Sequence, residues 1–426
     1  MIPPLLAPIL LCVIVIVSIV LMLIRPRNTP EAYWITGGVV VLLALRLISL
    51  KLVVAGIAKS LDVCFFLIGM MLLCEVAREH GVFDWLSASA VHHAGGSCMR
   101  LFTLIYAVGT AVTVFMSNDA TAVVLTPAIL AAVRKAKVQP LPYLFACAFV
   151  ANAASFLLPI SNPANLVVFH NAMPPLGKWL LAFGVPCLLS TVVTFFVMRR
   201  FFWRELRGTI DHKVDDRPLN ANGKMVLAGV GLMVAILLIA SSLEKNLGLP
   251  ACLAALGIAA VVCIKERANP LVLAREISWT TLVLVAGLFI MVDAVESIGA
   301  MKYTRECLAW AQHLGLFGGE MVTGFALGIA NNLVNNLPLG LIAGSTLRVA
   351  RASGPLTQAV LIGVDVGPNL SITGSLATIL WLIALRKEDV NVTFWQFLEL
   401  GAITMPVALF ASLLSGILMN LCFPAL

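Results

Sequence analysis

Apolar and polar positions follow one another along this chain in long blocks, without the short periods of a soluble domain. The first half has apolar runs at roughly 5–24, 32–57, 61–77, 101–133, 141–170 and 178–198, and the second half has them at roughly 225–241, 250–264, 279–296, 321–347, 357–385 and 394–422. Most of these runs approach or exceed the roughly 20 apolar residues that cross a bilayer as a helix. The pattern predicts an all-α polytopic membrane protein with no sizeable soluble domain.

Proline, glycine and amide residues interrupt four of these runs. The breaks lie at Asn118-Asp119 in 101–133, near Pro159 to Pro163 in 141–170, at Asn331 to Pro338 in 321–347 and near Gly367 to Ser375 in 357–385. Non-helical backbone at membrane depth is tolerated only around a cavity or inside protein, because the bilayer offers no water to free backbone groups. We interpret 101–133 and 321–347 as re-entrant hairpins, and 141–170 and 357–385 as broken helices that meet near the midplane.

The order of runs and breaks repeats between the two halves of the chain. Gly69, Glu75 and Gly81 match Gly287, Asp293 and Gly299 at an offset of 218 residues, and Asn152 and Ser161-Asn162 match Asp365 and Gly374-Ser375 at an offset of 213. Five crossings and one hairpin in each half would turn the second half upside down relative to the first. The sequence therefore predicts an inverted-topology repeat, with halves at 1–210 and 225–426 joined by a linker at 211–224. Twelve simple helices are the alternative, which would leave Pro338 inside a continuous lipid-exposed helix.

Composition supports this class and sets the orientation. Hydrophobic residues make up 61% of the chain and charged residues 12%, about half the charged share of an average soluble protein. The net charge of +7 resides in short loops, so the positive-inside rule explains it better than nucleic-acid binding does. The basic central loop is expected in the cytoplasm and both termini outside it. Arg348 and Arg351 fall outside and are the main exception. Arg25 and Arg27 follow the first run, which indicates a retained span and not a cleaved signal peptide.

Several classes of chemistry have no matching motif in the sequence. The ten cysteines show no CxxC spacing, and the six histidines form neither HxxxH nor HExxH. No Walker A, GxGxxG or GxSxG motif occurs, which argues against ATP hydrolysis by this chain. We therefore expect a transporter that is not an enzyme and carries no cofactor or bound metal.

The residues beside the breaks are mostly neutral hydrogen-bonding groups. The predicted substrate site comprises Ser117, Asn118, Thr121, Ser161, Asn162, Asn165, Asn335, Asn336, Thr373, Gly374 and Ser375. Amides and hydroxyls both donate and accept hydrogen bonds, so such a site suits a small polyhydroxylated solute or a partly dehydrated ion. A dicarboxylate would need a basic clamp or helix N-termini, and no basic residue lies in these motifs.

Asp119 and Asp365 are the only carboxylates beside the breaks. A charge at membrane depth is costly, so such residues are functional candidates. Burial favours the neutral carboxyl, which would allow either group to load and unload a proton in each transport cycle. Alternatively, Asp119 caps the helix that begins at Ala120, and Asp365 has a structural role.

These motifs resemble those of the ArsB arsenite efflux permeases. The resemblance rests on Asn118 to Pro127, Ser161-Asn162 with Asn165, Asn335 to Pro338, and above all Gly363 to Asn369 followed by Thr373 to Trp381. Such permeases belong to the ion transporter superfamily, with NhaD-type sodium/proton antiporters and dicarboxylate carriers.

The resemblance implies export of arsenite and antimonite, as neutral trihydroxy species, from a prokaryotic cell across its plasma membrane in exchange for protons. It also implies an elevator-like motion and optional energising by a soluble ATPase subunit, ArsA. Members can carry Cys and Lys where this chain has Val364 and Asn369. Neither a thiol nor a fixed positive charge at those positions is therefore required here.

Three other functions stay open on the sequence. A sodium/proton antiporter would use the same carboxylates and would respond to sodium without metalloid. A passive arsenite channel would leave a buried Asp119 without a purpose. A membrane-embedded enzyme or a structural subunit belongs to a different class, and the enzyme would need a nucleophile with its base or a metal cluster.

Overall fold

The computed structural model describes residues 6–210, 218–267, 269–352 and 354–423, and this part of the chain forms helices and no named β-strand. The first half contains α1 (Leu6–Ile24), α2 (Glu31–Ala44), α3 (Leu50–Glu79), α4 (Val82–His93), α5 (Cys98–Phe115), η2 (Ala120–Leu125), α6 (Thr126–Lys135), α7 (Leu141–Ala153), η3 (Pro159–Ser161), α8 (Pro163–Phe169), η4 (His170–Ala172) and α9 (Leu176–Phe201). Eight helices of the described residues are long and apolar enough to cross a membrane. The predicted all-α polytopic class is confirmed.

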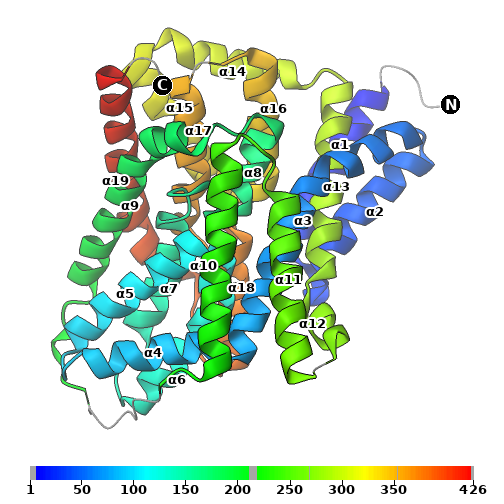
Figure 1. Cartoon of the computed structure of the whole chain (residues 1–426). Helices are drawn as coiled ribbons and strands as arrows, with labels where there is room; N and C mark the ends of the chain where they lie inside the picture. The colour runs from blue at the N-terminus through cyan, green and yellow to red at the C-terminus, as the bar shows by residue number, and fades with distance from the viewer. Residues whose placement is uncertain (1–5, 211–217, 268, 353, 424–426) are drawn as a thin grey trace.

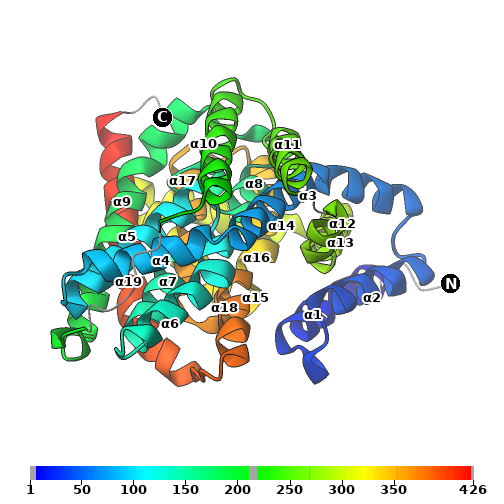
Figure 2. The same ribbon diagram turned by 60° about the horizontal axis from the view of Figure 1, so that its bottom comes forward.

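The second half continues with the same kinds of element. It contains α10 (Ala221–Ser242), α11 (Gly248–Glu266), α12 (Pro270–Glu276), α13 (Trp279–Ser297), α14 (Met301–His313), α15 (Gly315–Val334), α16 (Asn336–Ala350), α17 (Gly354–Val366), η6 (Gly367–Leu370), η7 (Ile372–Gly374), α18 (Leu376–Lys387) and α19 (Phe394–Cys422). In Figure 1, α1, α2 and α13 form one flank of the molecule, and α9 and α19 form the opposite flank. Figure 2 shows the same separation from a second direction.

Two boundaries differ from those that the apolar runs predicted. The run 32–57 is two helices, because Arg46 takes a left-handed backbone (φ 55°) and Ser49 then caps α3 by accepting from Leu52 N at 3.2 Å. The predicted gap between 57 and 61 lies inside α3, where the polar Lys59 pairs with Asp293 of α13 at 2.7 Å. A charged residue that finds a partner on a neighbouring helix does not end its own helix.

The linker and two surface helices also differ from the prediction. The described end of the predicted linker 211–224 is already helical from Ala221, and Asn220 caps it by accepting from Gly223 N at 2.6 Å; residues 211–217 lie outside the described residues. The sequence interpretation missed α4 and α14, which are amphipathic and follow Gly81 (φ 69°) and Gly299 (φ 75°). These left-handed glycines let the chain turn sharply out of α3 and α13.

The two hairpins enter the helical body from opposite ends. The start of α5 hydrogen-bonds to Gly208, just after α9, and Arg134 at the end of α6 contacts Glu388 at 3.4 Å. Arg348 near the end of α16 lies beside a cavity that also contains Lys178, at the start of α9. The 26-residue α9 is about 39 Å long. In Figure 1, α6 lies at the bottom of the molecule and α16 near the top. The exact repeat boundaries and the membrane orientation stay predictions.

Close backbone packing holds the second hairpin against α17. A Cβ added to Gly363 would lie 2.6 Å from Gly324 O, and one added to Gly367 would lie 2.5 Å from Gly328 Cα. Glycine on both helices therefore permits an approach that any side chain would prevent.

We expect Gly363→Ala to destabilise the protein by about 1–3 kcal/mol, the usual cost of an overpacked interior. The measurement is the thermal unfolding midpoint of the purified protein. The matched control is Gly231→Ala on α10, where an added Cβ has no neighbour within 4 Å. Equal unfolding midpoints for the two variants would show that α15 and α17 can move apart without a loss of stability.

Candidate functional site

The broken helices of the two halves are hydrogen-bonded to each other at their interruptions. Asn162, at the start of α8, donates from Nδ2 to Asp365 Oδ1 near the end of α17. In the reciprocal contact, Asn152 near the end of α7 donates to Asn369 Oδ1 at 3.0 Å and to Thr378 Oγ1 at 3.3 Å. The two halves are thus joined by side-chain hydrogen bonds at the places where their helices are interrupted.

Local hydrogen bonds hold each break in shape. Asn162 also caps α8 by accepting from Ala164 N at 3.0 Å, and Ser375 caps α18 by accepting from Thr378 N at 3.1 Å. Asn165 Nδ2 donates to the carbonyl of Ser155 at 2.9 Å. These side chains replace the helical hydrogen bonds that the breaks remove, which is what burial of irregular backbone requires.

Each hairpin tip touches a break. Ser161 Oγ donates to Val114 O of α5 at 2.9 Å, which joins the first break to the first hairpin. Asn335, at the tip of the second hairpin, takes φ 78° and donates from Nδ2 to Thr373 O at 3.3 Å. Thr373 in turn donates to Asn332 O at 2.8 Å. The site is therefore built from both hairpins and both broken helices.

The first hairpin tip leaves its carboxylate without a hydrogen-bond donor among the described residues. Ser117 Oγ accepts from Ala120 N at 3.1 Å, and Asn118 Oδ1 accepts from Asp119 N at 2.9 Å. The side chain of Asp119 makes no capping bond to η2, so the capping alternative is wrong and Ser117 has that role. Since η2 is π-helical, it is a type of local distortion found often at functional sites.

Asp365 is fully buried in the network. Its side chain is 0% exposed, its Oδ1 accepts from Asn162, and its Oδ2 has no hydrogen-bond partner among the described residues. No described basic side chain pairs with it. A carboxylate in such a place is stable when it carries a proton or a bound cation.

The other unpaired polar atoms beside the breaks are also acceptors. They are the amide oxygens Oδ1 of Asn152, Asn165, Asn331 and Asn336, and all four residues are at most 2% exposed. A buried acceptor without a donor is costly. The site is therefore suited to a group that brings hydroxyl or other donors, or a positive charge.

The remaining predicted residues divide between the network and the packing around it. Thr121 Oγ1 pairs with Thr113 Oγ1 at 2.8 Å within the first hairpin. A Cβ added to Gly374 would lie 2.5 Å from Pro368 Cα, so this position needs close packing. The predicted role of each residue in substrate binding stays a prediction.

Sequence reasoning left out five residues that the structure places in the site: Asn152, Asn331, Asn332, Asn369 and Thr378. The side chain of Asn332 makes three of these bonds. Its Oδ1 accepts from Ser371 N and Ser371 Oγ, and its Nδ2 donates to Gly367 O at 3.1 Å. The doubled amides Asn331-Asn332, and the match of Asn152 to Asp365 in the repeat, were the available signals. Among the described residues, no three His, Cys, Asp or Glu side chains could together hold a metal ion.

Comparison with known proteins gives one family model that matches residues 19–364, described as a citrate transporter (CitMHS). The "Arsenical pump membrane protein" of Escherichia coli is 26% identical over 412 residues, which cover 92% of this chain and 95% of the relative. The protein of the same name from Yersinia enterocolitica is 26% identical over 80% of this chain and 82% of its own length. These matches confirm the resemblance that the motifs indicated.

A solved structure shows the same fold. The Alcanivorax borkumensis YdaH transporter, described as having an unusual topology, superposes with a TM-score of 0.59. The superposition covers 87% of this chain and 88% of that one, at 17% sequence identity. At this identity the likeness concerns the fold alone.

The contact between Asn162 and Asp365 can be tested by exchanging donor and acceptor. Asn162→Asp keeps the cap on α8 but places two carboxyl groups face to face, and both cannot be ionised there. The folded variant then holds an extra proton, so its stability should fall as pH rises, by about 1.4 kcal/mol for each pH unit. The measurement is the unfolding midpoint against pH, relative to the unmodified protein.

The matched control restores one amide and one carboxyl by combining Asn162→Asp with Asp365→Asn. This exchange should return the pH dependence toward that of the unmodified protein. A single variant with an unchanged pH profile would show that the two side chains do not meet in the folded protein.

Proposed function

The chain belongs to the CitMHS family, whose model is described as a citrate transporter, and we propose that this member exports arsenite and antimonite in exchange for protons. Its relatives in Escherichia coli and Yersinia enterocolitica carry the name arsenical pump membrane protein. Both metalloids are carried as neutral trihydroxy species, so the solute brings three hydroxyl donors.

The unpaired acceptors beside the breaks are the observation that carries this proposal. Oxygens of Asn152, Asn165, Asn336 and Asp365 lack donors, and a trihydroxy solute supplies donors without adding charge. Citrate would bring acceptor oxygens and several negative charges to a site with unpaired acceptors and two carboxyl groups. The same geometry supports a neutral solute over a tricarboxylate, although the family is described by citrate.

Asp119 and Asp365 carry the protons in this proposal. Asp365 lies inside the network, and Asp119 lies at the first hairpin tip with no hydrogen-bond donor among the described residues. The adjoining η2 packs on α3. The solute and the proton then compete for one set of atoms, because a protonated carboxyl donates where the solute's hydroxyl would. Such competition is what couples two fluxes in opposite directions.

An elevator-like motion is part of the proposal. The second hairpin packs on α19 through α15, and the broken helices pack on α9 through α7 and α17, while α3 packs on α11 and α13. Tyr106 of the first hairpin donates to Thr191 O of α9 at 2.7 Å. Moving the first group past the second would carry the whole site, with its hydrogen bonds intact. A soluble ATPase subunit would act at the Arg134 end, which carries the basic loops and is the proposed cytoplasmic face. The unpaired acceptor oxygens could also coordinate a sodium ion. Sodium/proton exchange is therefore the second candidate function.

The substrate is tested by proton flux into or out of proteoliposomes under an imposed pH gradient. Arsenite, antimonite, sodium and citrate are added separately. We expect proton movement with arsenite and antimonite alone. A response to sodium without metalloid would establish the antiporter instead, and a response to citrate would contradict the argument from unpaired acceptors.

Asp119→Asn should abolish proton-coupled arsenite exchange and leave the unfolding midpoint nearly unchanged, because the side chain makes no hydrogen bond that the amide would lose. The measurement is arsenite transport by the variant with and without a pH gradient. The matched control is Asp84→Asn, at an exposed position of α4. Normal gradient-driven transport in Asp119→Asn would remove this residue from the mechanism.

A further inference from the structure

A third buried carboxylate lies outside the site described above. Glu320 belongs to the second turn of α15, near the Lys178 end, and its residue is 1% exposed. Asn420 of α19 is its one hydrogen-bond donor among the described residues, at 3.4 Å from Oε1. That distance is long for a hydrogen bond, so the carboxyl group has little compensation for its burial.

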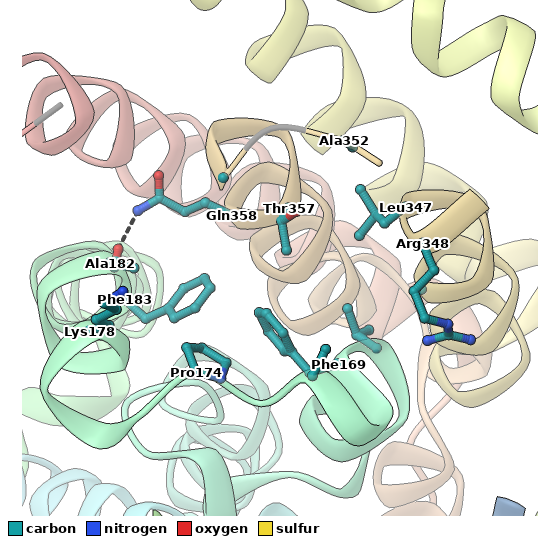
Figure 3. Close-up of a pocket in the computed structure, with 14 residues that line it drawn as sticks. Phe169, Pro174, Lys178, Ala182, Phe183, Leu347, Arg348, Ala352, Thr357 and Gln358 are labelled. Carbon is teal, nitrogen blue, oxygen red and sulfur yellow. Dashed lines mark hydrogen bonds between the residues drawn. The ribbon is translucent and has the colours of Figure 1, made fainter. Parts of the chain in front are cut away.

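A chain of amides leads from this carboxyl group to a cavity. Asn420 Nδ2 also donates to Gln358 Oε1 of α17 at 2.7 Å, and Gln358 Nε2 donates to the carbonyl of Ala182 on α9. Gln358 and Ala182 both line a cavity of about 310 Å³ at the Lys178 end. Figure 3 shows the bond between them at the edge of this cavity, with Phe183 and Phe169 beside it.

At the corresponding positions, the first half of the chain has aromatic residues in place of this cluster. At the offset of 218 residues that relates Gly81 to Gly299, Glu320 corresponds to Phe102, which is 0% exposed. At the offset of 213 that relates Asn162 to Ser375, Gln358 corresponds to Phe145, which packs against Phe202 with ring centroids 5.8 Å apart. Aromatic packing satisfies the fold at these positions, so the polar group in the second half has another purpose.

No described basic side chain neutralises Glu320. On the adjacent α14, the charged residues Lys302, Arg305 and Glu306 are exposed. On α16, Arg348 bonds to Ser345 and points away from Gln358 in Figure 3. On α17 the nearest ionisable group along the helix is Asp365, seven residues from Gln358 and on the same helix face, roughly 10 Å away. On α19, Glu399 is exposed.

We propose that Glu320 is a proton-binding site on the Lys178 side of the transporter, filled from the cavity that Gln358 lines. The cavity reaches the amide cluster at Gln358, and a small movement of Asn420 would open the carboxyl group to water from it. The carboxyl group then loads and unloads its proton from that face of the protein. Proton binding by Glu320 does not depend on the proposed function. Only its part in proton-coupled export rests on that proposal.

The test compares Glu320→Gln with the unmodified full-length protein in lipid. Infrared difference spectra between low and high pH should show a protonated-carboxyl band in the unmodified protein that Glu320→Gln lacks. Glu320→Asp should keep such a band, and the exposed control Glu306→Gln should leave the spectrum unchanged. Identical spectra for Glu320→Gln and the unmodified protein would overturn the proposal.

Transport gives the second readout. In proteoliposomes, Glu320→Gln should retain arsenite counterflow without a pH gradient but lose the stimulation that a gradient gives, while Glu306→Gln keeps both. Unchanged stimulation in Glu320→Gln would overturn the role in proton transfer. Failure of the unmodified protein to move protons with arsenite would contradict the proposed function. The infrared spectra would still show whether Glu320 binds a proton.

Discussion

Irregular backbone inside a membrane has no water to pair with, and this constraint organises the structure. The chain meets it by letting each interrupted helix use the other half of the molecule. Asn369 of the second half donates to the carbonyl of Phe149 in α7 at 3.0 Å, and the side chains of Asn162 and Asp365 pair across the two halves. Bonds of this kind reduce the number of polar groups that the breaks leave unpaired inside the membrane. The site therefore lies where the two halves of the chain supply hydrogen-bond partners to each other.

This dependence also limits how the protein can move. Hydrogen bonds join the two breaks to each other and to both hairpins, so separation of the halves at this point would expose several polar groups together. A motion that keeps the network intact costs less than one that opens it. That is the physical argument for carrying the site as a unit past α3 and α13.

The sequence was sufficient where one constraint decides the outcome. Long apolar runs decide the class, and proline with paired amides decides where helices break, as at Asn335 to Pro338. It was insufficient where a partner distant in sequence decides. Lys59 stays inside α3 because Asp293 pairs with it, and Asn332 organises the second tip through Ser371 and Thr373. The amphipathic helix α14 was missed because its composition is as polar as that of a loop.

The proposed repeat matches each buried carboxyl group to a residue that cannot ionise. Asp119 matches Asn336, Asp365 matches Asn152, and Glu320 matches Phe102. An inverted repeat with identical residues would give its two end states equal energies. With an ionisable group at one member of each pair, those energies would depend on protonation, and therefore on the pH at each face. In the proposed mechanism the inverted repeat would supply the two states, and the unmatched carboxyl groups would let a proton gradient favour one of them.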